Sequence, residues 1–340
     1  MSNTSSIESA VRLPRLASTL KAARAYSRQA EKPLSIDGQA RYNMRSAMDL
    51  HPGIGKWISR RVVNERSPEA WALADLDSSR FADLDEITRA VAGIQRDGFY
   101  VFDKVVAPSI TEEIRAFAEQ APCIARGAGT PAATYPRSAP TVGRYDLEEA
   151  VSLQCPEVQE FATDPVMARI SQLYLGQPVM MDEVAFWWTT TQRAQDANVN
   201  AQQFHQDRDR LSFLKFFIYL TDVTPDTGPH VYLKGSHRQI PRSMRGDGRK
   251  TDEAVREAGL WQNVTELTGP AGTLMAVDTI GLHKGKTPTA GDRLALETEF
   301  ATSLFGMDYE RPAFHPTDLA ASRFKQMPWV LQRYEPAVNA

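Results

Sequence analysis

Three residues of this sequence have the side chains and the spacing to bind one metal ion. His205 and Asp207 are separated by a single residue just before an apolar segment, and His283 follows a second apolar segment. Residues i and i+2 of an extended strand point to the same face, so His205 and Asp207 can reach one ion. Two imidazoles and one carboxylate on one face of an octahedron leave three positions open, which is the ligand set of non-haem iron(II) oxygenases. The pattern predicts such a site.

Ordinary structural roles for the same residues stay open at this point. A histidine and an aspartate two residues apart recur by chance in many chains. His205 could cap a strand or donate a hydrogen bond to Asp207, and His283 could be a hydrogen-bonded histidine of the core. The segments around these residues must decide between the two interpretations.

Most of the chain beyond residue 85 reads as short strands separated by turns. Apolar and aromatic runs predict strands at 99–102, 179–191, 211–220, 230–233, 274–277 and 293–300. Helix patterns at 86–96, 109–119 and 164–174 flank them, the second with the Ser109 and Glu112 spacing of a capping box. We therefore expect a mainly β fold with flanking helices, whose core is a jelly-roll, cupin-like double-stranded β-helix.

The patterning divides the chain into two parts. Residues 1–84 are helix-like and broken at Pro14, Pro33 and Pro52, which predicts an N-terminal helical extension before a jelly-roll domain at 85–340. Within that domain, about 239–268 reads as an insertion with helical character at 243–261. The stretch from Cys123 to Tyr145 is rich in Gly, Pro and Ser without a hydrophobic period, so we predict a long loop, either an active-site lid or a plain mobile loop.

The metal-binding pattern is embedded in a longer series of segments that resembles the phytanoyl-CoA dioxygenase family over about residues 85–303. The segments are Phe204-His205-Gln206-Asp207, LKFFIYLTDV at 214–223, Thr227-Gly228-Pro229, Lys234-Gly235-Ser236-His237-Arg238, Gly272-Thr273-Leu274, His283 and Arg293. The resemblance implies iron(II) ligation by His205, Asp207 and His283. It also implies that Arg293 binds the far carboxylate of 2-oxoglutarate, with dioxygen as the second co-substrate.

Arg293 suits that role, because a guanidinium is a planar fork that pairs with a carboxylate and stays charged at any working pH. The sequence departs from a common pattern at Ala295, where many relatives of the wider superfamily have a hydroxyl group. A second hydrogen-bond donor to 2-oxoglutarate must then come from elsewhere. The candidates on neighbouring strands are Thr190, Gln192 and Lys215.

Two further polar residues are candidates for contact with the substrate. Strand alternation puts Glu297 on the face of Arg293, where it either lines the pocket or pairs with a nearby arginine. His230 stands where relatives of the family have an apolar residue, and we expect it to line the pocket. Trp187, Trp188, Phe213 and Phe217 are expected to belong to the core, and His237 to have a structural role.

The resemblance implies oxidation of an unactivated C–H bond, with release of succinate and carbon dioxide; the carboxylate of Asp207 favours hydroxylation, although desaturation or ring formation would need the same ligands. Because no basic cluster for the phosphates of an acyl-CoA stands out, we expect the substrate to be a small metabolite of a specialised biosynthetic pathway. Two alternatives remain: a jelly-roll metalloenzyme that does not use 2-oxoglutarate, and a non-catalytic binding member of the family. Arg293 discriminates against the first alternative, because an enzyme that does not use 2-oxoglutarate needs no anchor for it; turnover of 2-oxoglutarate to succinate tests the second. The substrate itself stays open, because function depends on the site rather than on the fold.

Composition excludes several other classes of function. The chain has 340 residues, 42% of them apolar, and a formal charge of −3, which argues against nucleic acid as a partner. No run approaches the ~18 apolar residues of a membrane span. We expect a cytoplasmic enzyme that acts on a small-molecule substrate. The composition is also compatible with a homo-oligomer. The basic N-terminus fits an exposed helix or a transit peptide, and Cys123 and Cys155 fit ordinary thiols.

Overall fold

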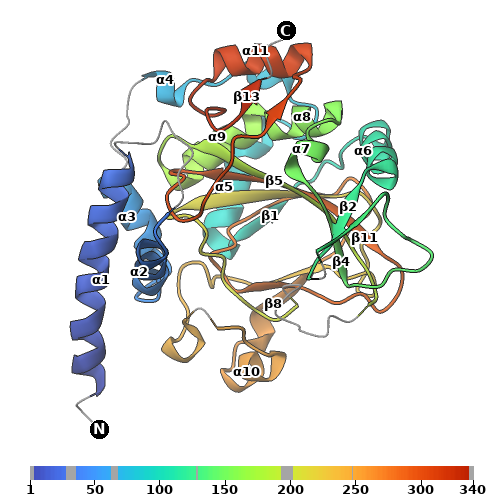
Figure 1. The fold of residues 1–340 in the computed structure, drawn as a ribbon. Helices are drawn as coiled ribbons and strands as arrows, with labels where there is room; N and C mark the ends of the chain where they lie inside the picture. Colours follow the sequence, from blue (N-terminus) through green and yellow to red (C-terminus); the bar gives the residue numbers. More distant parts are fainter. Residues whose placement is uncertain are drawn as a thin grey trace.

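The computed structural model describes residues 4–27, 36–62, 68–127, 129–192, 202–246 and 248–336 (Figure 1). Over these ranges, antiparallel strands form a large and a small sheet. The large sheet has the order β1 (Phe99–Val101), β9 (Leu274–Val277), β6 (Phe213–Tyr219), β11 (Arg293–Ala301), β5 (Met180–Thr189), β4 (Arg144–Leu147), β2 (Cys123–Ala125), β3 (Thr130–Ala132). The small sheet has the order β10 (His283–Gly285), β7 (His230–Leu233), β8 (Val264–Leu267). The predicted jelly-roll core with flanking helices is confirmed.

The central strands of the large sheet are buried on both faces, and their side chains alternate between two environments. On β11, Leu294 and Leu296 belong to the large core cluster on the helical side. Ala295 belongs to a cluster on the opposite side that includes Tyr232 of the small sheet. Residues of β11 that are two positions before or after Ala295 point to the same side as Ala295, so they face the space between the sheets. Arg293 and Glu297 lie on this inner face.

Helices cover the outer face of the large sheet (Figure 1). Their apolar residues, including Ile94, Ile114, Phe161 and Ile170, form one core with the outer side chains of β6, β9 and β11. The covering elements are α4 (Pro68–Trp71), η1 (Leu76–Ser78), α5 (Glu86–Asp97), α6 (Pro108–Gln120), α7 (Glu149–Ser152), α8 (Pro156–Ala162), α9 (Pro165–Leu175) and α11 (Asp318–Gln326). This core leaves the inner face of the sheet free to build a site.

The N-terminal helices pack beside the sheets. They are α1 (Thr4–Ser27), α2 (Gly38–Met48) and α3 (Ile54–Val62). Met44 and Ile58 share a buried cluster with Phe213 and Phe305, which holds these helices against the end of the large sheet. The predicted break at Pro14 is wrong, because α1 continues through it. A proline removes one backbone donor, and the neighbouring turns keep their own hydrogen bonds. Pro33 lies outside the described residues.

The predicted loop between Cys123 and Tyr145 is also wrong in part. Strands β2 and β3 form a hairpin there, and β4 begins at Arg144. These strands add to the edge of the large sheet through backbone hydrogen bonds, so they need no apolar period. The predicted capping box at Ser109 is wrong as well, because α6 begins at Pro108 after Ala107 without a side-chain cap.

The predicted insertion at about 239–268 contains one element of the core. Its last residues form β8, which pairs with β7. The rest contains η2 (Arg242–Met244), α10 (Asp252–Glu257) and η3 (Trp261–Asn263), which lie outside the small sheet (Figure 1). A short parallel pair, β12 (Ala313–Phe314) with β13 (Glu335–Pro336), lies near the C-terminus.

Candidate metal centre and substrate cavity

Backbone hydrogen bonds bring His205, Asp207 and His283 together. His205 and His283 form an antiparallel bridge in which each amide donates to the carbonyl of the other, at 2.9 and 3.0 Å. The amide of Asp207 donates to the Thr279 carbonyl at 2.9 Å. Because β10 begins at His283 and pairs with β7, the segment at 205–207 lies along the edge of the small sheet. Sheet pairing thus places residues from distant parts of the chain on one face.

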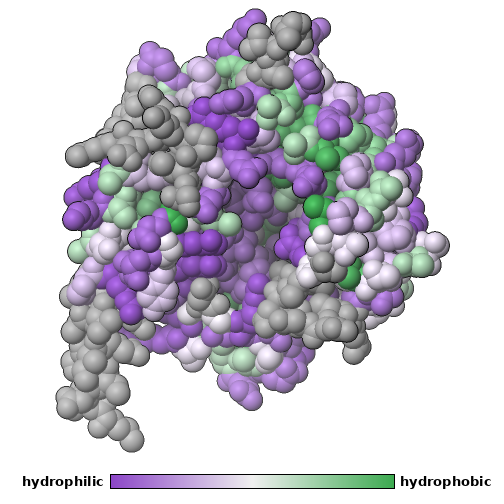
Figure 2. All heavy atoms as spheres, in the orientation of Figure 1, coloured by the Kyte–Doolittle hydropathy of each residue, from purple (hydrophilic) through white to green (hydrophobic). Residues whose placement is uncertain are grey.

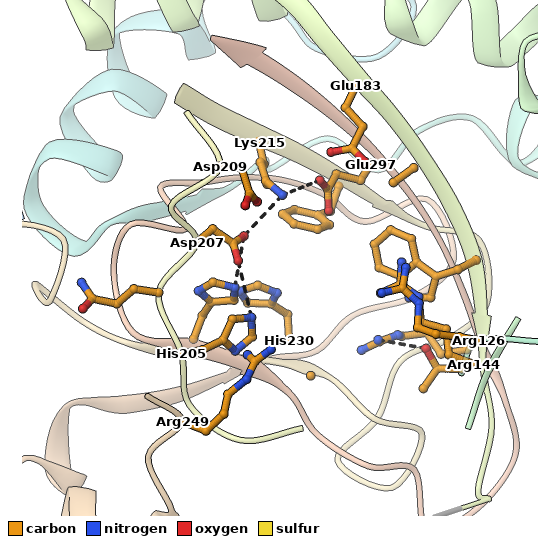
Figure 3. Close-up of a pocket in the computed structure, with 18 of the residues that line it drawn as sticks. Arg126, Arg144, Glu183, His205, Asp207, Asp209, Lys215, His230, Arg249 and Glu297 are labelled. Carbon is orange, nitrogen blue, oxygen red and sulfur yellow. Dashed lines mark hydrogen bonds and ion pairs between the residues drawn. The ribbon is translucent and has the colours of Figure 1, made fainter. Parts of the chain in front are cut away.

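The histidine rings are oriented with Nε2 toward Asp207. Nδ1 of His205 lies 2.9 Å from the Gln203 carbonyl, and Nδ1 of His283 lies 3.0 Å from the Gly281 carbonyl. A carbonyl can only accept, so both Nδ1 atoms carry the proton and both Nε2 atoms keep a lone pair. These Nε2 atoms lie 3.5 and 3.6 Å from the two carboxylate oxygens of Asp207. The ligand atoms all lie within 4.8 Å of one another (Figure 3).

The charges of this group suit a divalent metal ion. Burial, assisted by His283, lowers the pKa of His205 to about 3, so its ring is neutral at physiological pH. Burial acts to raise the pKa of Asp207, but the Lys215 ammonium and the two histidines outweigh it and hold the pKa below its usual range. Metal binding needs neutral imidazoles and an ionised carboxylate. His205, Asp207 and His283 therefore fit the iron(II) ion that the sequence predicts.

Arg293 is a buried cation that faces the same cavity. It begins β11 opposite Thr189 of β5, and only 6% of its surface is exposed. Its guanidinium donates to the Gly228 carbonyl and, at 3.2 Å, to the Thr189 hydroxyl. Among the described residues, no carboxylate lies within ion-pair distance of it. A buried charge without a counter-ion is costly, so this arrangement needs an anionic ligand.

The second donors expected beside Arg293 are placed differently. Thr190 is buried and donates to the Val142 carbonyl at 2.8 Å, and Gln192 is exposed; neither lines the cavity as described. The hydroxyl beside Arg293 belongs to Thr189, one residue earlier. Strand alternation explains the difference, because neighbouring residues of β5 face opposite sides of the sheet.

Lys215 lies away from Arg293, among carboxylates. Its ammonium nitrogen lies 2.9 Å from Glu297, 3.3 Å from Asp207 and 3.4 Å from Glu299. Burial acts to lower the pKa of Lys215, but these carboxylates outweigh it and raise the pKa well above its usual value. The partner of Glu297 is thus a lysine, where an arginine was the alternative, and Glu297 also lines the cavity.

The cavity extends from the triad to Arg293 and to charged side chains beyond, with a volume of about 510 Å³. Figure 2 shows a hollow near the centre of this face, bordered mainly by hydrophilic residues. Trp187, Phe217 and His230 line the cavity, whereas Trp188 and Phe213 are buried in core clusters. The ring of His230 stacks on His283 with centroids 5.3 Å apart.

Several charged residues of the cavity were missed by the sequence analysis. They are Arg45, Arg126, Arg144, Glu183, Asp209 and Arg249. Asp209 could have been found, because it continues the two-residue alternation of His205 and Asp207. The others come from separate strands and loops, so no local pattern indicates that they share a cavity. Within the described ranges, the structure has no helix both long and apolar enough to cross a membrane.

Among models of known protein families, one matches most of the jelly-roll region. The family model of phytanoyl-CoA dioxygenase (PhyH) matches residues 94–295, more than half of the chain. No curated protein matches the sequence significantly.

Solved structures match with low identity. The epimerase SnoN from nogalamycin biosynthesis, in complex with Fe3+, alpha ketoglutarate and nogalamycin RO, is 18% identical, with a TM-score of 0.46 over 64% of this chain and 84% of that one. HygX from Streptomyces hygroscopicus with nickel and 2-oxoglutarate bound is 16% identical, with a TM-score of 0.46 over 66% and 89%. AviO1 from Streptomyces viridochromogenes Tue57 is 17% identical, with a TM-score of 0.42 over 67% and 96%. At this level the three matches say nothing about the activity of this chain.

Proposed function

The chain belongs to the phytanoyl-CoA dioxygenase family, and from this premise we propose that it is an iron(II)- and 2-oxoglutarate-dependent oxygenase of a small molecule. The observation that carries the proposal is the buried guanidinium of Arg293, which faces the triad's cavity without a carboxylate partner among the described residues. A jelly-roll metalloenzyme without 2-oxoglutarate would have no use for this charge. A 2-oxo dicarboxylic acid supplies the missing carboxylate.

Each polar residue of the site has a defined task in this account. His205, Asp207 and His283 hold the metal, and the Gln203 and Gly281 carbonyls fix the tautomers of the histidines. Arg293 and Thr189 bind the far carboxylate of 2-oxoglutarate. Bound together, the metal and this co-substrate supply an oxidant from dioxygen, with release of succinate and carbon dioxide.

The remaining residues orient the reaction and exclude water. Lys215 forms an ion pair with the Asp207 carboxylate, which limits how the carboxylate can turn. Trp187 and Phe217 provide apolar surface in an otherwise charged cavity, and a substrate C–H bond is favoured near them over the charged walls. We propose hydroxylation of an unactivated C–H bond as the outcome, because the triad keeps its carboxylate and leaves the other metal positions to co-substrates.

The experiment is a binding and turnover assay on the full chain. We expect the protein to bind Mn(II), then 2-oxoglutarate, in calorimetry. With iron(II) and ascorbate it should convert 2-oxoglutarate slowly to succinate without substrate. Arg293→Met should abolish 2-oxoglutarate binding and leave metal binding intact, whereas the exposed Arg256→Met should change neither. A protein that binds metal but not 2-oxoglutarate would support a different jelly-roll metalloenzyme. One that binds both without any turnover, even with candidate substrates, would support a non-catalytic member.

A further inference from the structure

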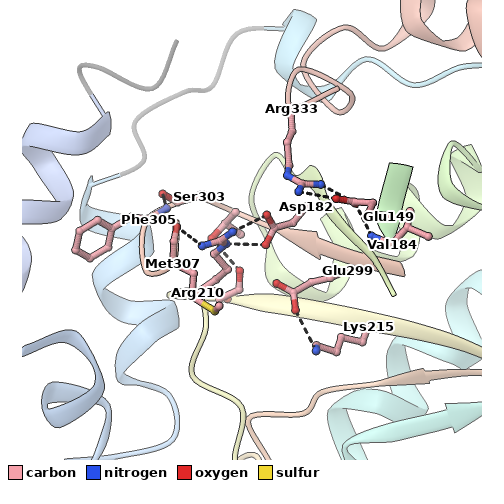
Figure 4. Close-up of polar contacts among 12 residues, drawn as sticks. Glu149, Asp182, Val184, Arg210, Lys215, Glu299, Ser303, Phe305, Met307 and Arg333 are labelled. Atoms are coloured by element: carbon pink, nitrogen blue, oxygen red, sulfur yellow. Dashed lines mark hydrogen bonds and ion pairs between the residues drawn. The ribbon is translucent and has the colours of Figure 1, made fainter. Parts of the chain in front are cut away.

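One wall of the cavity is built from charged side chains in register across three strands. Lys215 of β6 pairs with Glu299 of β11, and Glu299 pairs with Glu183 of β5. Glu297 is the next inward-facing residue of β11. Carboxylate oxygens of the three glutamates lie within 4.8 Å of one another. Asp209 also lines this cavity, two residues beyond the metal-binding Asp207. We call Glu183, Glu297, Glu299 and Asp209 the carboxylate wall; Figure 3 shows Glu183, Glu297 and Asp209, and Figure 4 shows Glu299.

A β-bulge lies directly beside Glu183, which itself continues the inward-facing alternation of Ala185, Trp187 and Thr189 on β5. The register between β5 and β11 shifts so that Glu299 lies opposite Glu183 and Phe300 lies opposite Met181, which leaves Asp182 as the extra residue. Bulges re-aim side chains and recur next to functional sites. Asp182 pairs with Arg210 at 2.6 and 2.9 Å behind the wall, and Glu183 lines the cavity.

Among the described residues, Lys215 is the one cation that forms ion pairs with the carboxylate wall. Lys215 contacts Glu297 and Glu299, and it is shared with Asp207. Glu183 and Asp209 form no hydrogen bond or ion pair through their carboxylates within the part of the chain that the structure describes. Burial, with repulsion from Glu297, raises the pKa of Glu183 to about 7 despite Lys215.

Nearby carboxylates outside the cavity are treated differently. Figure 4 shows Asp182 paired with Arg210 and Glu149 paired with Arg333. The arginine of the second pair lies 2.7 Å from each oxygen of Glu149. The fold therefore supplies arginine counter-ions to the acids behind the wall and none to Glu183, whose side chain is exposed in the cavity.

Two of the cations across the cavity are already paired with another carboxylate. Arg126 and Arg144 both donate to Asp146, at 2.7 to 3.0 Å. Arg144 also stacks over the ring of Trp187, with its guanidinium carbon 4.2 Å from the ring centroid. Figure 3 places Arg126 and Arg144 across the open space from Glu297. They do not neutralise the carboxylate wall.

A second, independent group also lacks a partner in this cavity. His230 is 8% exposed, its side chain lines the cavity, and its Nε2 atom has no hydrogen-bond partner among the described residues. A buried polar atom without a partner costs about 1–3 kcal/mol, so an orphaned one that faces a cavity indicates a polar ligand there. The cavity is thus built for a molecule with hydrogen-bonding groups.

We propose that the substrate of this enzyme carries a protonated amine, which binds to Glu183 and Asp209 of the carboxylate wall while another part of the molecule is oxidised at the triad. The proposal rests on the proposed function, because it assigns the same cavity to that reaction. A bound ammonium supplies the missing cation and donates charge-assisted hydrogen bonds to both carboxylates. A neutral lipid or a dicarboxylic acid would leave both groups without a counter-ion.

The probes for the test are benzylamine, benzyl alcohol and benzoate, which share a ring and differ in charge. Their affinities are measured by calorimetry on the full chain loaded with Mn(II) and 2-oxoglutarate. Paramagnetic broadening of the probe signals by Mn(II) checks that they bind near the triad. We expect benzylamine to bind about ten-fold or more tightly than benzyl alcohol, the scale of one charge-assisted hydrogen bond, and benzoate to bind most weakly.

Isosteric neutral variants assign the preference to the wall. The double variant Glu183→Gln with Asp209→Asn should lose the preference for the amine and keep Mn(II) and 2-oxoglutarate binding. The exposed Glu112→Gln on α6 should behave as the original protein. Equal affinity for amine and alcohol, no measurable binding of either, or a preference that survives the double variant would each overturn the proposal.

The design separates this proposal from the proposed function. If Mn(II) and 2-oxoglutarate bind but the amine is not preferred, only the amine inference fails. If they do not bind, the proposed function fails, and the amine preference is then measured on the unloaded protein. Binding of a second Mn(II), lost in Glu183→Gln and competing with benzylamine, would mean that the wall is a metal site, which overturns the amine assignment.

Discussion

The two ends of the cavity solve the problem of buried charge in opposite ways. At the triad, local partners hold each ligand in place: carbonyls accept from the histidine Nδ1 atoms, and Lys215 forms an ion pair with Asp207. At the carboxylate wall, Glu183 and Asp209 have no such partner within the described ranges. The triad is organised in advance for an ion, whereas the wall leaves its charge to be completed by a ligand. The structure of the triad is thus determined by the reaction, whereas the charges of the carboxylate wall are determined by the substrate.

The largest expected effect is at the triad. His283→Ala removes one of its Nε2 ligands, and we expect Mn(II) binding to be abolished in calorimetry. Even the loss of a hydrogen-bond partner of a ligand costs about 10–100-fold in metal affinity, so loss of the ligand itself should exceed this. His315→Ala changes an exposed histidine and is the matched control. Metal affinity that is equal in both variants would mean that the triad is not the metal site.

Lys215 joins the two ends, and its loss should affect stability. Lys215→Met leaves Asp207, Glu297 and Glu299 without their shared cation, and breaking a buried ion pair costs about 3–5 kcal/mol. We expect the free energy of unfolding in urea to fall by about this amount. Adding Glu297→Gln to the same protein should recover part of the loss, because one buried charge is removed. A Lys215→Met protein as stable as the original would show that the carboxylates are balanced in another way.

The same contrast explains what the sequence could predict. His205, Asp207 and Arg293 lie in short segments whose alternation is visible locally, so the triad and the anchor could be placed on the inner face. The sequence indicated Thr190 where the structure places Thr189 beside Arg293. Which residues of a strand face inward depends on how the strand pairs with its neighbour, and the sequence alone does not show this pairing. Glu183 follows the same two-residue alternation as Thr189 along β5, so it was missed for the same reason: the inward face of this strand was not assigned.

Arg293 should have an effect of intermediate size. Arg293→Lys keeps the charge and loses the planar fork, and we expect 2-oxoglutarate affinity to fall about 10–100-fold, on the scale of a hydrogen bond to a charged group. Calorimetry on the Mn(II)-loaded protein measures this, and Arg256→Lys is the surface control. If Arg293→Lys binds 2-oxoglutarate as tightly as the original protein, the anchor lies elsewhere.

The smallest expected effect is a pH dependence at the wall. The pKa of Glu183 is raised to about 7 by burial, in surroundings that include Lys215, Glu297, Asp182 and Glu149. Below this pH the carboxyl is protonated and cannot pair with an ammonium, and above it the carboxylate is ionised. Benzylamine, which stays protonated in this range, should bind a few-fold more tightly at about pH 8 than at about pH 6. Glu183→Gln should flatten the profile, and an unchanged slope in that variant would assign the titration to another group.

The most direct test of the central claim is a crystal structure of the full chain with Mn(II) and 2-oxoglutarate, with the metal located by anomalous scattering. The account predicts one strong peak bounded by Nε2 of His205, a carboxylate oxygen of Asp207 and Nε2 of His283, with the far carboxylate of 2-oxoglutarate on Arg293 and Thr189. A peak among Glu183, Glu297 and Glu299 in place of the triad, or a 2-oxoglutarate carboxylate bound away from Arg293, would contradict it.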